Sequence, residues 1–224
     1  MNWELMWDSL PKLLGGAPLT LQLTGLSLAV GIVIAAVAAA ARLSDNLLFR
    51  GAAWSYVFIF RGTPLLVQIF LIYYGLGQFE AVRQSFMWPV LREAYWCAVL
   101  ALALNTGAYA SEIFRGAVLS VPHGQVEAAR ACGMSRWLAF RRIVAPQALR
   151  QALPAYGNEV VLMVKASSLA STVTLLEITG VARRLISQTY AVIEIFIVAG
   201  EIYMALNTLA AVAVRWFEKR MATA

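Results

Sequence analysis

Charged residues divide the chain into long apolar segments. Between Lys12 and Arg42 lie 29 uncharged residues, whereas a helix needs only about 20 apolar residues to cross a hydrocarbon core about 30 Å thick. The long apolar segments between charged residues predict five membrane-spanning helices, at about residues 18–41, 51–77, 94–116, 153–178 and 185–214. A soluble helical protein would instead show a polar face that repeats every 3.6 residues. The pattern therefore predicts an all-α membrane protein.

Composition supports this prediction. Hydrophobic residues make up 61% of the 224 residues and charged residues only 13%, whereas a soluble domain carries about 25% charged residues. Five or six spans use nearly the whole length, so we expect a single transmembrane domain over residues 1–224. The first residues are acidic rather than basic, so we expect no cleaved secretory signal.

The excess of positive charge predicts an orientation. The chain has 18 Lys and Arg against 12 Asp and Glu, a net charge of +6. In a multi-pass protein such an excess marks the cytoplasmic loops before it suggests nucleic acid. Residues 42–50, 115–150 and 215–224 carry 11 of the basic residues, and the segments of the opposite side carry 5. We expect the N-terminus outside, the C-terminus in the cytoplasm, and no nucleic-acid partner.

The connection at about residues 117–150 is long and basic, and it predicts a helix, a turn and a second helix. Ser120 is expected to cap the first helix, with Pro122 in its first turn. Gly133 stands where the helix needs a residue that accepts positive φ in order to end. Ser135 is expected to cap the second helix, which Pro146 would interrupt.

Two interpretations of this loop remain open. A basic amphipathic segment can lie on anionic lipid at the membrane surface. Alternatively, the small side chains of Ala128 and Ala129 favour close contact with another protein.

Polar residues inside the spans mark a candidate substrate pathway. The sequence Arg61-Gly62-Thr63-Pro64 interrupts the second span, and broken helices at membrane depth are tolerated only within protein or beside a water-filled cavity. Arg61 either has a structural role there or lines the pathway. Ionisable residues within a membrane are functional candidates by default. The candidates are Arg61, Thr63, Gln68, Asn158, Glu159, Lys165, Ser168, Glu194 and Glu201.

Spacing relates four of these charges to one another. Glu194 and Glu201 are seven residues apart, which places them on one helix face about 10 Å apart. Glu159 and Lys165 are six apart, so they do not share a face. The two carboxylates of the fifth span would suit a cationic substrate or basic residues of a partner subunit.

The third span carries small residues at four-residue spacing, Ala103, Gly107 and Ser111. Such a seam lets two helix backbones approach closely within a membrane. We expect it to pack against another helix.

Several kinds of chemistry lack the residues they need. None of the lysines, at positions 12, 165 and 219, follows a glycine, so there is no Walker A loop for ATP. The only histidine, His123, is remote from any serine of the spans, and no cysteine pair occurs. We therefore expect no catalysis, no metal site and no cofactor in this chain. An ion-coupled secondary transporter without an ATPase remains an alternative that explains the spans.

Motifs along the chain resemble those of one membrane protein family. Glu127-Ala128-Ala129, followed by Gly133 and by residues 143–146, resembles the EAA loop, EAA-x3-G-x9-I-x-LP, of the permease subunits of bacterial ABC importers. Ala145 departs from it, since that position is usually Leu. Residues 60–68, FRGTPLLVQ, and 108–116, AYASEIFRG, resemble signatures of the polar amino acid subfamily, most closely of permeases for histidine, lysine, arginine and ornithine or for opines.

This resemblance implies a type I ABC importer permease fold in the bacterial inner membrane. It implies that Glu127, Ala128, Ala129 and Gly133 couple the chain to a cytoplasmic ATPase, which binds ATP and Mg. The implied partners are a second permease subunit, identical or homologous, two ATP-binding subunits, a substrate-binding protein and a polar amino acid substrate. The resemblance implies that this substrate is a basic amino acid or an opine.

Overall fold

The computed structural model describes residues 2–222, which are almost entirely helical. The α-helices are α1 (Trp3–Leu14), α2 (Ala17–Arg42), α3 (Leu47–Gly62), α4 (Leu65–Phe70), α5 (Glu80–Arg83), α6 (Trp88–Leu91), α7 (Ala94–Leu119), α8 (His123–Ala131), α9 (Arg136–Ala139), α10 (Ala145–Ala166), α11 (Ile178–Thr189) and α12 (Val192–Ala222). Four short π or 3₁₀ segments join them: η1 (Leu71–Gly75), η2 (Leu76–Gln78), η3 (Phe140–Val144) and η4 (Ser167–Val173). The predicted all-α class is confirmed.

Three helices, α2, α7 and α12, are each long and apolar enough to cross a membrane. Two bent pairs qualify as further spans, namely α3 with residues 65–78, bent by 108°, and residues 136–173 with α11, bent by 48°. Five spans result if each bent pair counts as one. Their limits differ from those expected. The helix of the fourth span, α10, begins at Ala145 rather than at about residue 153. The helix of the fifth span, α12, begins at Val192 rather than at about residue 185, because residues 178–189 form α11 and Tyr190 ends α11 at φ 57°.

The break between α3 and α4 follows from Pro64. Proline has no backbone N–H and pushes the residue before it out of the helical region. Thr63 is accordingly extended, with φ −115° and ψ 145°, and ends α3. The interruption expected from the sequence is therefore present, but it turns the chain sharply instead of merely loosening one straight span.

The core forms where α2 crosses α7. A Cβ atom added to Gly107 would lie 2.9 Å from Ile34 Cγ2 of α2 and 2.9 Å from the Tyr56 hydroxyl of α3. Gly31 of α2 in turn faces Thr106 of α7. These glycines permit the close backbone approach, so the small-residue seam of the third span packs as predicted.

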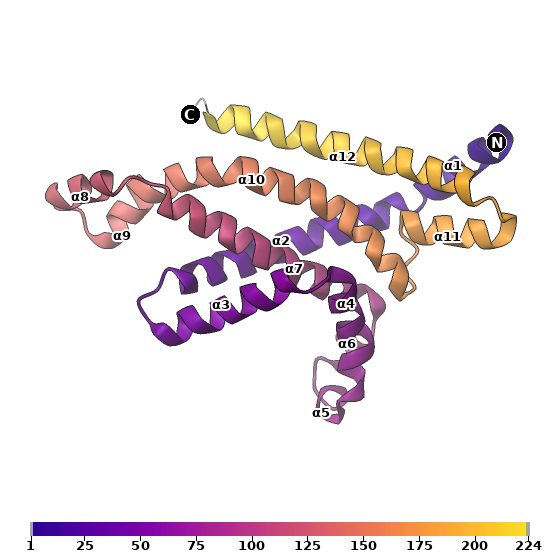
Figure 1. Cartoon of the computed structure of the whole chain (residues 1–224), viewed down its shortest axis with the longest axis horizontal. Helices are drawn as coiled ribbons and strands as arrows, with labels where there is room; N and C mark the ends of the chain where they lie inside the picture. The colour runs from indigo at the N-terminus through magenta and orange to yellow at the C-terminus, as the bar shows by residue number, and fades with distance from the viewer. Residues whose placement is uncertain (1, 223–224) are drawn as a thin grey trace.

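The ends of the long helices gather in two regions of the molecule. Figure 1 shows α8, α9 and the turn between α2 and α3 toward one end of the long axis, and the C-terminal end of α12 points toward that same end. The N-terminal helix α1 and α11 lie at the opposite end. The three most basic segments are thus toward one end of the molecule, as the five-span topology requires.

The loop between α7 and α10 differs in two details from the expected helix, turn and helix. Ser120 ends α7, and α8 begins after Pro122, whose backbone is extended. Gly133 adopts φ +80° and Ser135 accepts a hydrogen bond from Leu138 N at 3.3 Å, both as predicted. Pro146 does not interrupt the second helix, because α9 continues through the π turn η3 and Pro146 lies in the first turn of α10. Pro146 is tolerated there because it stands at the start of α10, directly after the π turn η3.

Candidate functional site

The side chain of Gln68 fills the break between α3 and α4. It is only 5% exposed, and its Nε2 donates hydrogen bonds to Phe60 O at 2.8 Å, Thr63 O at 3.1 Å and Thr63 Oγ1 at 2.9 Å. A broken helix frees carbonyl groups that must find partners in a membrane. Gln68 and Thr63 therefore hold the bend together. They were expected to line the substrate pathway, and this structural role was not foreseen from the sequence.

Asn105 joins this bend to the middle of α7. Its Nδ2 donates to Gln68 Oε1 at 3.0 Å and to Phe60 O at 3.3 Å. Nearby, the hydroxyl of Tyr56 donates to Leu104 O at 2.6 Å. The break is therefore fixed against the most buried of the long helices.

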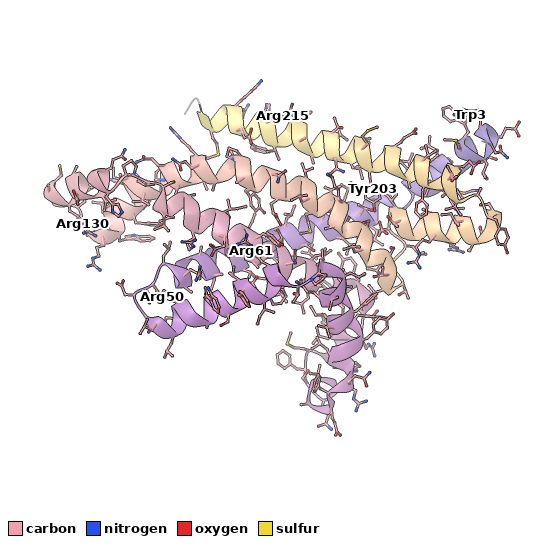
Figure 2. The ribbon with its side chains drawn as sticks, in the orientation of Figure 1. Trp3, Arg50, Arg61, Arg130, Tyr203 and Arg215 are labelled. Atoms are coloured by element: carbon pink, nitrogen blue, oxygen red, sulfur yellow. The ribbon has the colours of Figure 1, made fainter. Side chains whose placement is uncertain are left out.

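Two residues of opposite charge, Arg61 and Glu159, lie near this bend. The Arg61 guanidinium lies 5.1 Å from the centre of the Tyr109 ring, and Arg61 is near the middle of the long axis (Figure 2). Glu159 of α10 is 8% exposed, and its carboxylate lies near the Thr106 hydroxyl and within electrostatic reach of Arg61. An arginine of one span and a buried glutamate of another thus lie in the same region as the helix break, without an ion pair between them among the described residues.

A cavity of about 290 Å³ opens between α7 and α10 beside Glu159. Its lining residues are Asn105, Tyr109, Glu159, Leu162, Met163 and Ala166. Small-molecule sites occupy roughly 300–1,000 Å³ and combine an apolar wall with a few polar groups. A carboxylate next to an aromatic ring attracts cations through charge and through the face of the ring. The cavity is therefore suited to a small cation.

Lys165 and Ser168 line a second region, a groove between α10 and α12. It consists of two adjoining cavities of about 590 and 310 Å³, which share Lys165, Gly200 and Tyr203. Glu159 and Lys165 face different cavities, which confirms that they do not share a helix face. Asn158 is exposed and is not among the described residues that line these cavities.

The structure does not bring Glu194 and Glu201 to Glu159. Glu194 is half-buried and Glu201 is exposed on α12, and within the described part of the chain neither lines the groove or the Glu159 cavity. Of the three carboxylates expected in the pathway, only Glu159 is enclosed by this chain.

A buried glutamate that sequence analysis missed, Glu177, fixes the start of α11. It is fully buried and accepts hydrogen bonds from Thr179 N at 3.0 Å, Gly180 N at 2.9 Å and the Tyr203 hydroxyl at 2.5 Å. The Thr20 hydroxyl of α2 meets Ile178 N beside it at 3.4 Å. The sequence could have indicated this role, because an acidic residue directly before a helix often caps the N–H groups of the first turn.

The loop helix α8 presents two of the expected coupling residues to solvent. Glu127 and Ala128 are exposed, whereas Ala129 is 5% exposed and packs against the chain itself. Gly133 ends the helix at φ +80° with no atom within 4 Å of an added Cβ. Another protein can therefore contact Glu127 and Ala128, whereas Ala129 packs against the rest of this chain and holds α8 in place.

An ionic cluster ties α2 to α7 near the same end. Glu112 accepts from Arg42 Nε at 3.2 Å and from Arg115 Nη2 at 2.7 Å. All three side chains are partly shielded, with 18% of the Arg42 and Glu112 side chains and 29% of the Arg115 side chain exposed. The carboxylate is thus shared by two arginines, a network stronger than an isolated surface pair.

Comparison with known proteins identifies relatives over nearly the whole chain. Residues 31–223 match the family model described as "Binding-protein-dependent transport system inner membrane component". The octopine transport system permease protein of Rhizobium meliloti is 60% identical over 206 residues, covering 92% of this chain and 84% of that protein. The histidine/lysine/arginine/ornithine transport system permease protein of Escherichia coli K12 is 42% identical, covering 97% and 92%.

Solved structures agree with these relatives. A crystal structure of an amino acid ABC transporter with histidines superimposes with a TM-score of 0.88 at 34% identity, covering 98% of this chain and 99% of the other. An inward-facing methionine ABC transporter matches with a TM-score of 0.72 at 18% identity, which shows a shared fold. The fold expected from the loop motif is confirmed.

Proposed function

The chain belongs to the family of inner membrane components of binding-protein-dependent transport systems, and we propose that the importer it serves carries a cationic amino acid or an opine. It is a permease subunit of an amino acid ABC importer. Its relatives are named for octopine, for nopaline and for histidine, lysine, arginine and ornithine.

Glu159 carries the proposal for the substrate. Its carboxylate is buried at the helix break, and it shares a cavity with Tyr109 and Asn105. Arg61 already lies over the Tyr109 ring. A guanidinium or ammonium group of the substrate would take the same kind of position, between a carboxylate and a ring face. Displacement of Arg61 from the ring would then accompany substrate binding.

The other expected pathway residues are proposed to contact the substrate, or the second permease subunit, elsewhere along the translocation pathway. Lys165 and Ser168 would meet the carboxylate end of the substrate in the groove between α10 and α12. Glu194 and Glu201 would reach the pathway where α12 meets the second permease subunit. Asn158, exposed on α10, would face the same contact.

The proposed assembly has two permease subunits, identical or homologous, two ATPase subunits that bind ATP and Mg, and a substrate-binding protein outside. The exposed Glu127 and Ala128 would enter a groove of the ATPase, a helix-in-groove contact. ATP binding would favour one arrangement of the two halves and hydrolysis the other, because each state of the ATPase binds one arrangement more tightly. The N-terminus would lie outside the inner membrane and the C-terminus in the cytoplasm.

Uptake by reconstituted vesicles tests this proposal. The full complex is placed in vesicles with the binding protein outside and ATP inside, and uptake of labelled arginine and octopine is measured. We expect uptake that requires ATP and stops when the ATPase carries a substitution of its Walker A lysine. Uptake that an ion gradient drives in the absence of the ATPase would establish the secondary transporter instead.

A further inference from the structure

A basic cavity lies at the loop end of the molecule, apart from the substrate pathway. Its volume is about 350 Å³, and it is enclosed by the end of α7, by α8, by α9 and by η3. Three basic side chains line it, His123, Arg130 and Arg136, and no acidic residue is among the described residues of its wall. Figure 2 shows Arg130 at this end of the long axis. The cavity is thus built to attract an anion.

The cavity and the proposed ATPase contact use different faces of α8. His123, Val126 and Arg130 follow one another at spacings of three and four residues, which places them on one stripe of the helix. Glu127 and Ala128 lie on a neighbouring stripe and do not line the cavity. One face can therefore hold a ligand while the other contacts a protein.

An apolar cavity adjoins the basic one. It has a volume of about 150 Å³ and lies among α7, η3 and α10. Val118 and Phe140 line both cavities, so the two share a wall. Leu149, 56% exposed, lies at the outer side of the apolar cavity, and Leu119, also 56% exposed, borders the basic one. An apolar cavity beside a basic one fits a molecule that has an anionic head and a hydrocarbon tail.

We propose that the two cavities together bind one anionic phospholipid of the cytoplasmic leaflet. Its phosphate would accept hydrogen bonds from Arg130 and Arg136, since the planar guanidinium matches phosphate geometry. One acyl chain would pass Phe140 into the apolar cavity. Basic pockets beside membrane helices on the cytoplasmic side are known to hold anionic headgroups. A free phosphate would leave the apolar cavity unfilled, so the lipid explains both hollows. The inference does not depend on which substrate is carried.

Lipid retention by the purified complex tests the proposal. The permease with its ATPase is taken from vesicles of phosphatidylcholine and phosphatidylglycerol, and bound lipid is counted by native mass spectrometry. In the double variant Arg130→Gln, Arg136→Gln, we expect retained phosphatidylglycerol to fall about tenfold. The matched control is Arg141→Gln, Arg142→Gln, which removes equal charge from the same segment outside both cavities. It should retain the lipid within about twofold of the unmodified complex, because neither Arg141 nor Arg142 lines either cavity.

Other measurements need no substitution. Raising the salt concentration from about 0.05 to about 0.5 M should release phosphatidylglycerol but not phosphatidylcholine, because salt screens the headgroup contact. Equal retention of both lipids, or equal loss in the two double variants, would overturn the proposal. Displacement of phosphatidylglycerol by inorganic phosphate at millimolar concentration would assign the site to a soluble anion instead.

Discussion

Asn105 Nδ2 donates a hydrogen bond of 3.0 Å to Gln68 Oε1, and this contact joins the bend after Pro64 to the middle of α7. The same amide group of Asn105 reaches Phe60 O, which Gln68 also contacts. Two amide side chains thus share the carbonyl groups that the broken helix leaves free. The position of the Glu159 cavity depends on this bend, because Asn105 also lines that cavity.

Replacing Gln68 by leucine should destabilise the protein. The apolar side chain would remove the hydrogen bonds of Gln68 to Phe60 O, to Thr63 and from Asn105, and leave Thr63 O without its Gln68 partner, at a cost of about 2–4 kcal/mol. Thermal unfolding of the purified complex in detergent measures the loss. Gln78→Leu is the control, since Gln78 is exposed and makes a single weak hydrogen bond of 3.3 Å. Equal melting temperatures for the two variants would mean that the Gln68 contacts do not hold the bend.

Replacing Gly133 by valine should uncouple the ATPase. A β-branched residue at φ +80° costs about 1–3 kcal/mol, and α8 would then end differently. We expect the variant to enter the membrane normally but to lose ATPase in a pull-down. Gly51→Val serves as the control, because an added Cβ there also meets no atom within 4 Å but Gly51 lies within α3 and does not have positive φ. Full ATPase association and transport in Gly133→Val would remove the loop from its assigned role.

Replacing Tyr203 by phenylalanine should loosen α11. The Glu177 carboxylate would lose a hydrogen bond of 2.5 Å in a buried setting, which costs about 1–3 kcal/mol. Hydrogen exchange of the first α11 amides, including those of Thr179 and Gly180, should become faster. Tyr190→Phe removes the same hydroxyl from a side chain that is 87% exposed and should change nothing. Unchanged exchange in Tyr203→Phe would show that Glu177 holds α11 without it.

The ends of the chain should report opposite faces of the membrane. The basic segments predict this, as does an odd number of spans. Reporter proteins fused after Ala17 and after Ala224 would be assayed for periplasmic and cytoplasmic activity. A shared location for both reporters would exclude the five-span count.

Local physics predicted much of the helical organisation. Charge-free runs are long because lipid excludes charge, so the spans could be located, and Gly133 could be expected at positive φ from its place after a helix. Pro146 shows the limit of such rules. A proline within an apolar stretch can break a helix or begin one, and only the π turn before it decides which.

The site was less predictable because its contacts are distant in sequence. Gln68 and Asn105 are 37 residues apart, and Glu177 and Tyr203 are 26 apart. Spacing along one helix correctly separated Glu159 from Lys165, but it could not show which carboxylate is enclosed by neighbouring helices. Glu201 and Glu159 are both acidic residues in apolar segments, and packing alone makes one exposed and the other buried.

Uptake by the Glu159→Gln variant tests the proposed substrate most directly. The amide keeps the shape and can hydrogen bond, but it removes the negative charge from the cavity. Losing a carboxylate opposite a desolvated cation costs about 2–5 kcal/mol, so kcat/KM for arginine uptake should fall about 30-fold or more. ATP hydrolysis without substrate and assembly should stay normal, and Glu80→Gln, on exposed α5, should transport like the unmodified protein. Arginine uptake by Glu159→Gln at the unmodified rate would contradict a cation site at the helix break.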